Sequence, residues 1–258
     1  MAASFDFKRF SVENGDAGLK VGTDGVLLGA AVSLCGWGAV AYGDADMPCS
    51  GRILDIGTGT GVIALMLAQR TEGLGNGNPD VEAVGPRITG IDISCSATAP
   101  ANFARSPWAD RLEYRNESLA AYMDGDPGLS DLIVSNPPYY DNSLTCPDGD
   151  RCIARHTDTL SYREVITFAH DFLAPEGRIG LILPKQEETR LLRFAASFGF
   201  FPLRVLNVRT TASKSPSRII CEFSRVRARA VTEYLTISDE LGYTDEYKQL
   251  TKEFYLNF

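Results

Sequence analysis

The sequence has no long apolar segment, no excess of positive charge and few residues that commonly hold metals. None of its apolar runs reaches the ~18–20 residues that a membrane span needs, and the start of the chain lacks the apolar core of a signal peptide. We therefore expect a cytoplasmic protein that does not enter a membrane.

Cysteine and histidine are too few and too scattered to indicate a metal centre. The chain has six cysteines and two histidines among 258 residues, with no Cys-x-x-Cys spacing. The interval from Cys146 to Cys152 differs from that of a zinc knuckle. We predict reduced thiols and no bound metal.

The formal net charge of −8 counts against a general nucleic-acid coat, but it leaves room for a local basic patch. Basic residues gather near the end of the chain, offset there only by Glu222: Arg204, Arg209, Lys214, Arg218, Arg225, Arg227 and Arg229. Arg225, Arg227 and Arg229 alternate, so in a strand they would share one face. The pattern indicates a phosphate-binding surface. The alternative is a solvated sheet edge whose charges prevent strand pairing.

The composition is that of a globular protein. Hydrophobic residues make up 44% and charged residues 22% of the chain. No internal repeat or domain boundary is visible, so we predict a single domain over residues 1–258 with an aromatic N-terminal extension over residues 1–30. In that extension Phe5, Phe7, Phe10 and Val12 alternate loosely, which predicts packing on the domain surface or a small hairpin.

A glycine motif stands near the front of the chain, Leu54-Asp55-Ile56-Gly57-Thr58-Gly59-Thr60-Gly61. Residues 52–56 read as a buried strand and residues 62–68 as an apolar helix. Glycines between them allow a tight turn and the close approach of a ligand. In doubly wound α/β folds such a turn lies at the carboxyl end of the first strand, where nucleotides bind. The alternative is a connection with no ligand.

A second motif, Asn136-Pro137-Pro138-Tyr139, follows the buried strand 131–135. The prolines fix the backbone, so the Asn136 side chain and the Pro137 carbonyl can accept both hydrogens of a planar amine or amide. Tyr139 offers an aromatic face. The alternative is a polar loop ended by Pro-Pro.

Other expected strands end in polar residues as well. The strand 87–93 contains Asp92, which is placed to accept hydrogen bonds from ribose hydroxyls or, alternatively, to cap the next helix. The strand 111–115 precedes Glu117 and Ser118, at the position that usually meets adenine. Thr23 or Asp24 is expected to cap a helix that begins near Val26. Further strands are expected at 180–183, 203–209 and 218–225, and further helices at 96–105, 161–173 and 186–198 and near the C-terminus.

These motifs together resemble the bacterial tRNA1(Val) (adenine(37)-N6)-methyltransferase family of class I S-adenosylmethionine-dependent methyltransferases. The most specific stretch is Lys20-Val21-Gly22-Thr23-Asp24-Gly25-Val26-Leu27-Leu28-Gly29-Ala30, ahead of the glycine motif. The resemblance extends over nearly the whole chain, through Ser106-Pro107-Trp108, Ala154-Arg155-His156-Thr157, Leu183-Pro184 and Phe254-Tyr255-Leu256.

The resemblance implies an α/β, Rossmann-like fold: a seven-stranded, mostly parallel sheet with helices on both faces and an antiparallel last strand. It implies S-adenosylmethionine as cofactor and a valine tRNA as partner, with no obligate protein partner. The implied catalytic residues are Asn136, Pro137 and Tyr139. The implied cofactor residues are Lys20, Thr23, Asp55, Gly57, Gly59, Gly61, Asp92, Ile93, Glu117, Ser118 and Asn136. The implied substrate residues are Pro138, Tyr139, Tyr140, Arg155 and His156, and the charge pattern adds Arg225, Arg227 and Arg229.

Two points stay open in the sequence. The family usually has an acidic and then an apolar residue where this chain has Glu117-Ser118-Leu119, so either Glu117 or Ser118 could meet the adenine. Asn-Pro-Pro-Tyr also occurs in methyltransferases that modify a glutamine amide in proteins, and a non-catalytic RNA-binding relative is a second alternative. The arginines and the front motif favour RNA, and the intact motifs favour catalysis.

Overall fold

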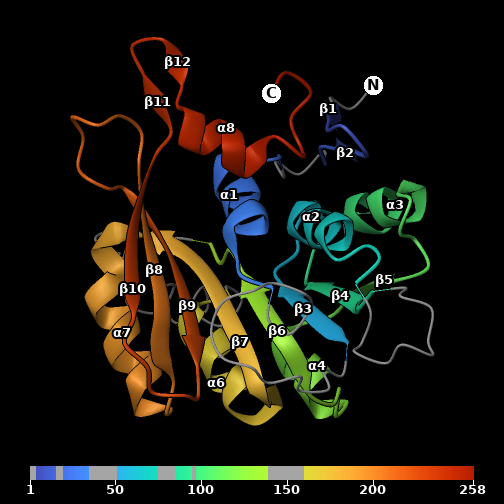
Figure 1. Cartoon of the computed structure of the whole chain (residues 1–258). Coiled ribbons are helices and arrows are strands. Elements are labelled where there is room, and N and C mark those ends of the chain that lie inside the picture. The colour runs from blue at the N-terminus through green and yellow to red at the C-terminus, as the bar shows by residue number, and fades with distance from the viewer. Residues whose placement is uncertain (1–3, 16–19, 35–50, 75–84, 95–96, 139–159) are drawn as a thin grey trace, which may run out of the picture.

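The computed structural model describes residues 4–15, 20–34, 51–74, 85–94, 97–138 and 160–258. Its centre is a sheet of eight strands in the order β10-β8-β9-β7-β6-β3-β4-β5 (Figure 1). The strands of this sheet are β3 (Arg52–Ile56), β4 (Arg87–Asp92), β5 (Leu112–Asn116), β6 (Ser130–Ser135), β7 (Leu173–Pro184), β8 (Phe201–Arg209), β9 (Arg218–Ser224) and β10 (Val231–Thr236).

The α/β, Rossmann-like class that the sequence predicts is confirmed. All neighbouring strands of the sheet pair in parallel except β9, which runs antiparallel to both β7 and β8. The antiparallel strand is the seventh of the sheet in chain order, as expected. The sheet has one strand more than predicted, because β10 adds in parallel to the outer edge of β8.

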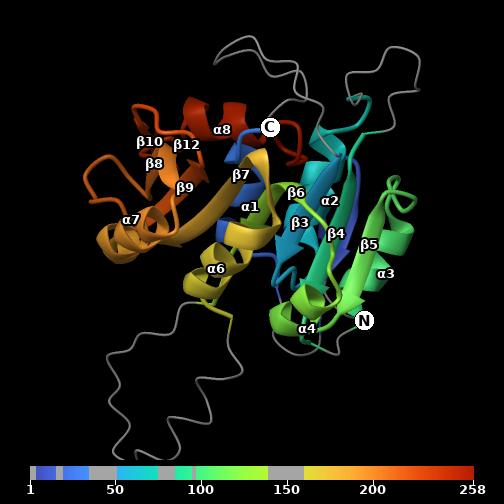
Figure 2. The same cartoon turned by 90° about the horizontal axis from the view of Figure 1, so that it is seen from below.

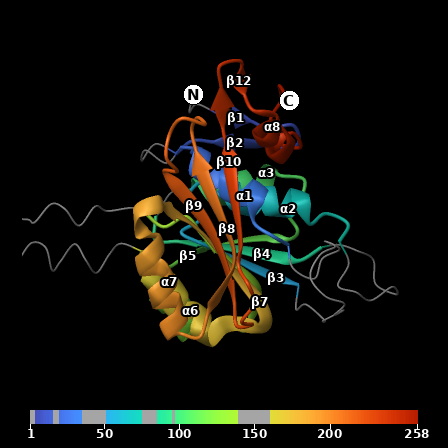
Figure 3. The same ribbon diagram turned by 60° about the vertical axis from the view of Figure 1, so that its left-hand side comes forward.

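Helices cover both faces of the sheet (Figure 3). On one face lie α1 (Thr23–Ala31), α2 (Val62–Arg70) and α3 (Thr98–Arg105). On the other lie α4 (Leu119–Asp124), α6 (Tyr162–Phe172) and α7 (Glu188–Ser197), with α4 and α6 next to each other (Figure 2). The 3-10 turn η1 (Lys185–Glu187) leads into α7, and α8 (Asp245–Thr251) lies near α1.

Alternate residues of the central strands belong to different cores. Leu132 and Val134 of β6 join the cluster under α1 and α2, whereas Ile133 joins the cluster under α6 and α7. Side chains of a strand point to opposite faces in turn. A strand covered on both faces therefore favours consecutive apolar residues, which explains Leu132-Ile133-Val134 in β6 and Ile53-Leu54 in β3.

The aromatic N-terminal segment forms a small hairpin, which is one of the two arrangements that the sequence predicts. Its strands β1 (Ser4–Asp6) and β2 (Ser11–Glu13) are antiparallel. Phe7 and Phe10 are buried, and Phe7 forms a bridge with Tyr255 near the other end of the chain. The Lys8 ammonium also donates to the backbone carbonyls of Lys252 and Phe258. Figure 1 shows the hairpin and the C-terminus side by side.

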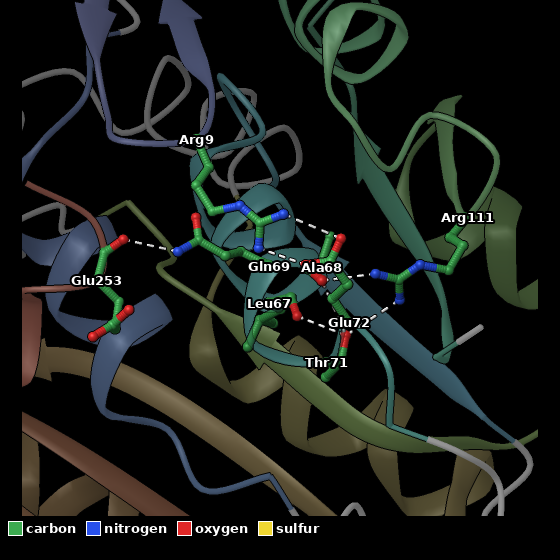
Figure 4. A network of polar contacts seen from close by, with 8 residues as sticks. All are labelled: Arg9, Leu67, Ala68, Gln69, Thr71, Glu72, Arg111 and Glu253. Carbon is green, nitrogen blue, oxygen red and sulfur yellow. Dashed lines mark hydrogen bonds and ion pairs between the residues drawn. The ribbon is translucent and has the colours of Figure 1, made fainter. Parts of the chain in front are cut away.

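A buried arginine fixes the end of α2 (Figure 4). The Arg111 guanidinium donates to the carbonyls of Ala68 and Pro86 at 2.7 and 3.0 Å, and to the Thr71 hydroxyl. The last carbonyls of a helix have no partner within the helix, and a cation there also meets the negative end of the helix dipole. Arg9 and Glu72 form an exposed ion pair nearby.

Two local predictions were wrong. The N-cap of α1 is Gly22, which supplies no side-chain cap, so neither Thr23 nor Asp24 caps the helix. Strand β9 ends at Ser224, so Arg225, Arg227 and Arg229 share no strand face. The C-terminal helix ends at Thr251, and Phe254 is buried beyond it. A small hairpin of β11 (Ser238–Asp239) and β12 (Gly242–Tyr243) precedes α8.

No helix among the described residues is long and apolar enough to cross a membrane.

Candidate active site

The carboxyl ends of four parallel strands meet at one edge of the sheet. Ile56 at the end of β3 pairs with Ile91 of β4 on one side and with Ser135 of β6 on the other. Asp92 at the end of β4 pairs with Asn116 at the end of β5. Since each predicted motif follows one of these strands, the register brings the glycine turn, Asp92, Glu117 and Asn136 to the same edge.

The glycine turn between β3 and α2 needs glycine at three positions. Gly57, Gly59 and Gly61 have φ values of 73°, 57° and 82°, in the left-handed region that other residues rarely adopt. A Cβ on Gly61 would lie 2.5 Å from the Phe103 ring. The amides of Gly57 and Thr58 both donate to the carbonyl of Ile91, at 2.9 and 3.0 Å. The turn is thus a rigid structure anchored to β4.

Asp92 closes the turn from the β4 side. Its carboxylate accepts hydrogen bonds from the backbone amides of Gly59 and Ser94, both at 2.8 Å. The alternative role, as the cap of the next helix, is wrong, because α3 begins after Ala97 and has no side-chain cap. Asp92 therefore joins the glycine turn directly, and it is half-buried at the carboxyl edge of the sheet.

Asp55 lies beneath the turn and is fully buried. One carboxylate oxygen accepts a 2.6 Å hydrogen bond from the Thr58 hydroxyl, while Oδ1 has no hydrogen-bond partner among the described residues. Burial raises the pKa of Asp55 to about 7, against the opposing effect of the Thr58 bond, and the nearby charge of Asp92 raises it further. A buried carboxylate with one unsatisfied oxygen favours binding a proton or a donor group.

Residues beyond β4 and β5 present one apolar and one acidic side chain. Ile93 is 56% exposed although it follows a buried strand. Ser118 is the N-cap of α4, and its hydroxyl accepts from the Ala121 amide. Glu117 is half-buried, and within the described part of the chain its carboxylate accepts no hydrogen bond and forms no ion pair. Of Glu117 and Ser118, the two candidates for a ligand contact, only Ser118 is used as a helix cap, so we favour Glu117 as the residue that contacts a ligand.

The second motif begins where β6 ends. The Ser135 hydroxyl donates to the carbonyl of Ile56 over 2.7 Å, which holds the end of β6 against the start of the glycine turn. Asn136 is half-buried, Pro137 buried and Pro138 exposed. Tyr139, Tyr140, Arg155 and His156 lie outside the described residues.

The front motif approaches this edge through α1. The Asp24 carboxylate accepts from the Arg218 guanidinium at 2.8 Å. Arg218 begins β9 opposite Pro184, the last residue of β7, so the ion pair lies at the carboxyl edge. Thr23 and Lys20 beside it are exposed. A long-range partner for Asp24 thus replaces the local cap that the sequence predicts.

The three arginines assigned to substrate lie at the opposite edge. Because β9 is antiparallel, its end at Ser224 pairs with Phe201 at the start of β8. The Arg225 guanidinium donates to the carbonyl of His170 at 2.6 Å, at the end of α6, and stacks on Phe200. Arg227 lies over the Phe201 ring. The fold does not bring these arginines to Asn136.

One residue of the site was missed in the sequence. Leu160 packs on the glycine turn, since a Cβ on Gly57 would lie 2.8 Å from its Cδ2. The available signal was Ser161-Tyr162-Arg163-Glu164, the pattern of a capping box that fixes a helix start. The structure contains that box, with both reciprocal bonds present.

No group of three or more His, Cys, Asp or Glu placed to hold a metal occurs within the ranges that the structure describes. Cys221 is a free, buried thiol, and burial raises its pKa to about 12.

The sheet order, the glycine turn and the acidic end of β4 define a class I methyltransferase fold. The family described as "Methyltransferase small domain" matches residues 44–202. Among solved structures, a predicted O-methyltransferase from Agrobacterium tumefaciens matches with a TM-score of 0.60 at 16% identity, covering 90% of this chain and 96% of that one. A ribosomal protein L11 methylase from Lactobacillus delbrueckii matches with a TM-score of 0.52 at 15% identity, covering 86% of this chain and 100% of that one.

Relatives in sequence are more specific. The tRNA1(Val) (adenine(37)-N6)-methyltransferase of Bacteroides thetaiotaomicron is 39% identical, covering 98% of this chain and 97% of its own. That of Aliivibrio fischeri is 36% identical, covering 100% and 99%. The chain belongs to the tRNA1(Val) (adenine(37)-N6)-methyltransferase family, which confirms the resemblance drawn from its motifs.

Proposed function

We propose that this protein transfers a methyl group from S-adenosylmethionine to the exocyclic N6 amine of adenine 37 in a valine tRNA. The observation that carries the proposal is the Ser135–Ile56 bond. It holds Asn136, the expected acceptor for the amine, beside the turn that Asp92 closes. Such a substrate is found in the cytoplasm, which is where we expect the protein.

The residues at the edge fit the proposed cofactor. Three left-handed glycines remove side chains from the approach to the turn. Asp92 offers a carboxylate to ribose hydroxyls, Ile93 an exposed apolar surface to the adenine, and Glu117 an acceptor to its amine. The unsatisfied Oδ1 of Asp55 lies beneath them. S-adenosylmethionine, when bound, supplies a methyl group made electrophilic by its sulfonium.

The chain's own residues orient the accepting amine. The nitrogen of adenine N6 is a weak nucleophile because its lone pair is delocalised into the ring. If the Asn136 side-chain oxygen and the Pro137 carbonyl accept its two hydrogens, the lone pair can point out of the ring plane. Those bonds strengthen as positive charge develops on nitrogen, so they stabilise the transition state more than the ground state. The proton leaves after transfer, and no strong base is required.

An unstacked base also needs a surface on which to lie. We assign this role to Tyr139, next to Pro138 in the sequence. The remaining proposed substrate contacts, Tyr140, Arg155 and His156, belong to the same stretch of chain.

The direct test is a methylation assay with purified protein and labelled S-adenosylmethionine. The substrates are an unmodified valine tRNA transcript, the same transcript with adenine 37 replaced by guanine, and a release-factor protein. We expect label only in the first, with mass spectrometry locating one methyl on N6 of adenine 37. Label in the release factor would favour the glutamine-amide alternative. Cofactor binding without any transfer would favour a non-catalytic RNA-binding protein.

A further inference from the structure

The glycine turn is covered on the α6 side by a side chain that no motif of the sequence identifies. Leu160 Cδ2 lies 2.8 Å from the position that a Cβ of Gly57 would take. Real Cβ atoms do not approach so closely, so glycine at position 57 leaves room for Leu160 as well as for a ligand. The two residues are in van der Waals contact, although they are far apart in the chain.

The backbone that carries Leu160 is fixed by the start of α6. The Ser161 amide donates to the Glu164 carboxylate at 2.8 Å, and the Glu164 amide donates to the Ser161 hydroxyl at 3.3 Å. Such a reciprocal box fixes the first turn of a helix. Leu160 directly precedes it, so its position against Gly57 is set by the helix.

The Leu160 side chain is only partly buried in the hydrophobic core. It packs against the buried cluster beneath α6 and α7, yet it stays half-buried. The turn that it touches is bordered by Asp92 on the β4 side and, through the Ser135–Ile56 bond, by Asn136 on the β6 side. Leu160 thus adjoins the turn that lies between these two residues.

We infer that Leu160 is a cofactor-contacting residue that forms the apolar wall of the S-adenosylmethionine site on the α6 side. Its exposed methyl carbons pack on an aliphatic part of the cofactor, while Asp92 and Glu117 bind the polar groups. The inference rests on the proposed cofactor. It assigns Leu160 a role in ligand affinity that a purely structural side chain would not have.

The test measures dissociation constants by calorimetry for S-adenosylmethionine and S-adenosylhomocysteine, together with the melting temperature. Leu160→Ala should weaken both ligands by about tenfold, since it removes partly buried methyl groups. Leu160→Met keeps the volume and should stay within about threefold of wild type. Leu192→Ala is the matched control, because Leu192 is also half-buried against the same cluster but belongs to α7.

The outcomes separate this inference from the proposed function. If wild type binds neither ligand, the proposed cofactor is wrong. If wild type binds and Leu160→Ala binds equally well at a lower melting temperature, Leu160 is only a core residue and the inference fails. Equal weakening by Leu160→Ala and Leu192→Ala would also overturn it.

A second variant covers the case in which Leu160→Ala does not fold. Leu160→Phe keeps an apolar side chain on the core and adds volume against Gly57. It should weaken cofactor binding at least as much as truncation, and unchanged affinity in a folded Leu160→Phe protein would contradict the inference.

Discussion

The hydroxyl of Ser135 and the carbonyl of Ile56 form a fully buried 2.7 Å hydrogen bond between β6 and β3. One partner immediately precedes Asn136 and the other immediately precedes Gly57. The bond therefore fixes the separation between the glycine turn, the proposed cofactor site, and Asn136, the proposed acceptor for the amine. Orientation of this kind can supply a large part of a rate enhancement.

Asn136→Ala should lower the turnover number at least about 100-fold, as when one oriented polar group at a charge-developing centre is removed. Because the bond tightens only in the transition state, the affinities for cofactor and tRNA should hardly change. Single-turnover methylation and separate binding measurements check this. Asn136→Asp keeps an acceptor and should retain more activity than Asn136→Ala. Full activity of a folded Asn136→Ala protein would remove the residue from the mechanism.

Asp92→Ala should weaken S-adenosylmethionine binding by about 1.5–3 kcal/mol, the range for hydrogen bonds to a charged group. The loss combines the proposed ribose contacts with the bond to the Gly59 amide. Asp92→Asn separates the two, since its amide oxygen can still accept from Gly59. An unchanged dissociation constant in both variants would show that another acid binds the ribose.

The stability of the protein should depend on pH through Asp55. Burial raises the folded-state pKa to about 7 from 3.8, so the folded protein keeps a proton that the unfolded chain has lost. The contribution of Asp55 is therefore full below the unfolded pKa and decreases as pH rises to about 7, by on the order of 1 kcal/mol per pH unit. Urea unfolding at several pH values should show a smaller decrease over this range for Asp55→Asn. Parallel profiles for the two proteins would argue against a protonated Asp55.

Replacing Arg225, Arg227 and Arg229 by Ala should destabilise the fold without raising the Michaelis constant for tRNA. Arg225 binds carbonyls at the end of α6, and its loss should cost about 1–3 kcal/mol of unfolding free energy.

Lys214→Ala is the contrasting variant. Lys214 is exposed between β8 and β9, at the same edge as Asn136, so its loss should reduce the salt dependence of tRNA methylation. A raised Michaelis constant in the triple variant, with no change in Lys214→Ala, would place the tRNA at the edge that holds the three arginines.

Two arginines near the end of α2 offer a comparison between buried and exposed charge (Figure 4). Arg111→Met leaves buried carbonyls at Ala68 and Pro86 without their donor, so it should lower the unfolding free energy by about 2–4 kcal/mol. Arg9→Met removes an exposed ion pair and should cost less than about 1 kcal/mol. Denaturant unfolding of both variants measures the difference. Equal effects would mean that the carbonyls find other partners.

Much of the site could be predicted from the sequence because it depends on local patterns. A mostly apolar segment followed by glycines specifies a buried strand and a turn, which located Gly57, and a similar segment that ends in an acid located Asp92. The same logic located Asn136 at the end of β6. Parallel strands then bring such residues to one edge without further information.

The features of the site that the sequence does not predict depend on contacts between residues that are far apart in the chain. Asp24 has the character of a helix cap, but Arg218, 194 residues away, binds its carboxylate instead. The alternation of Arg225, Arg227 and Arg229 indicates a strand, yet the direction and end of β9 are set by its pairing with β7 and β8. Leu160 has no special residue type, and the capping-box pattern after it indicates a helix start but not a contact with Gly57.

The pairing of Phe7 with Tyr255 has a consequence for the order in which the molecule can be completed. During synthesis the first hairpin leaves the ribosome long before the residues on which it rests. Phe10 can already stack on Phe7 and meet Trp108 once residue 108 has been made, but Phe7 gains its contact with Tyr255 only after residue 255 has been synthesised. The N-terminal hairpin therefore reaches its final packing late in the synthesis of these residues.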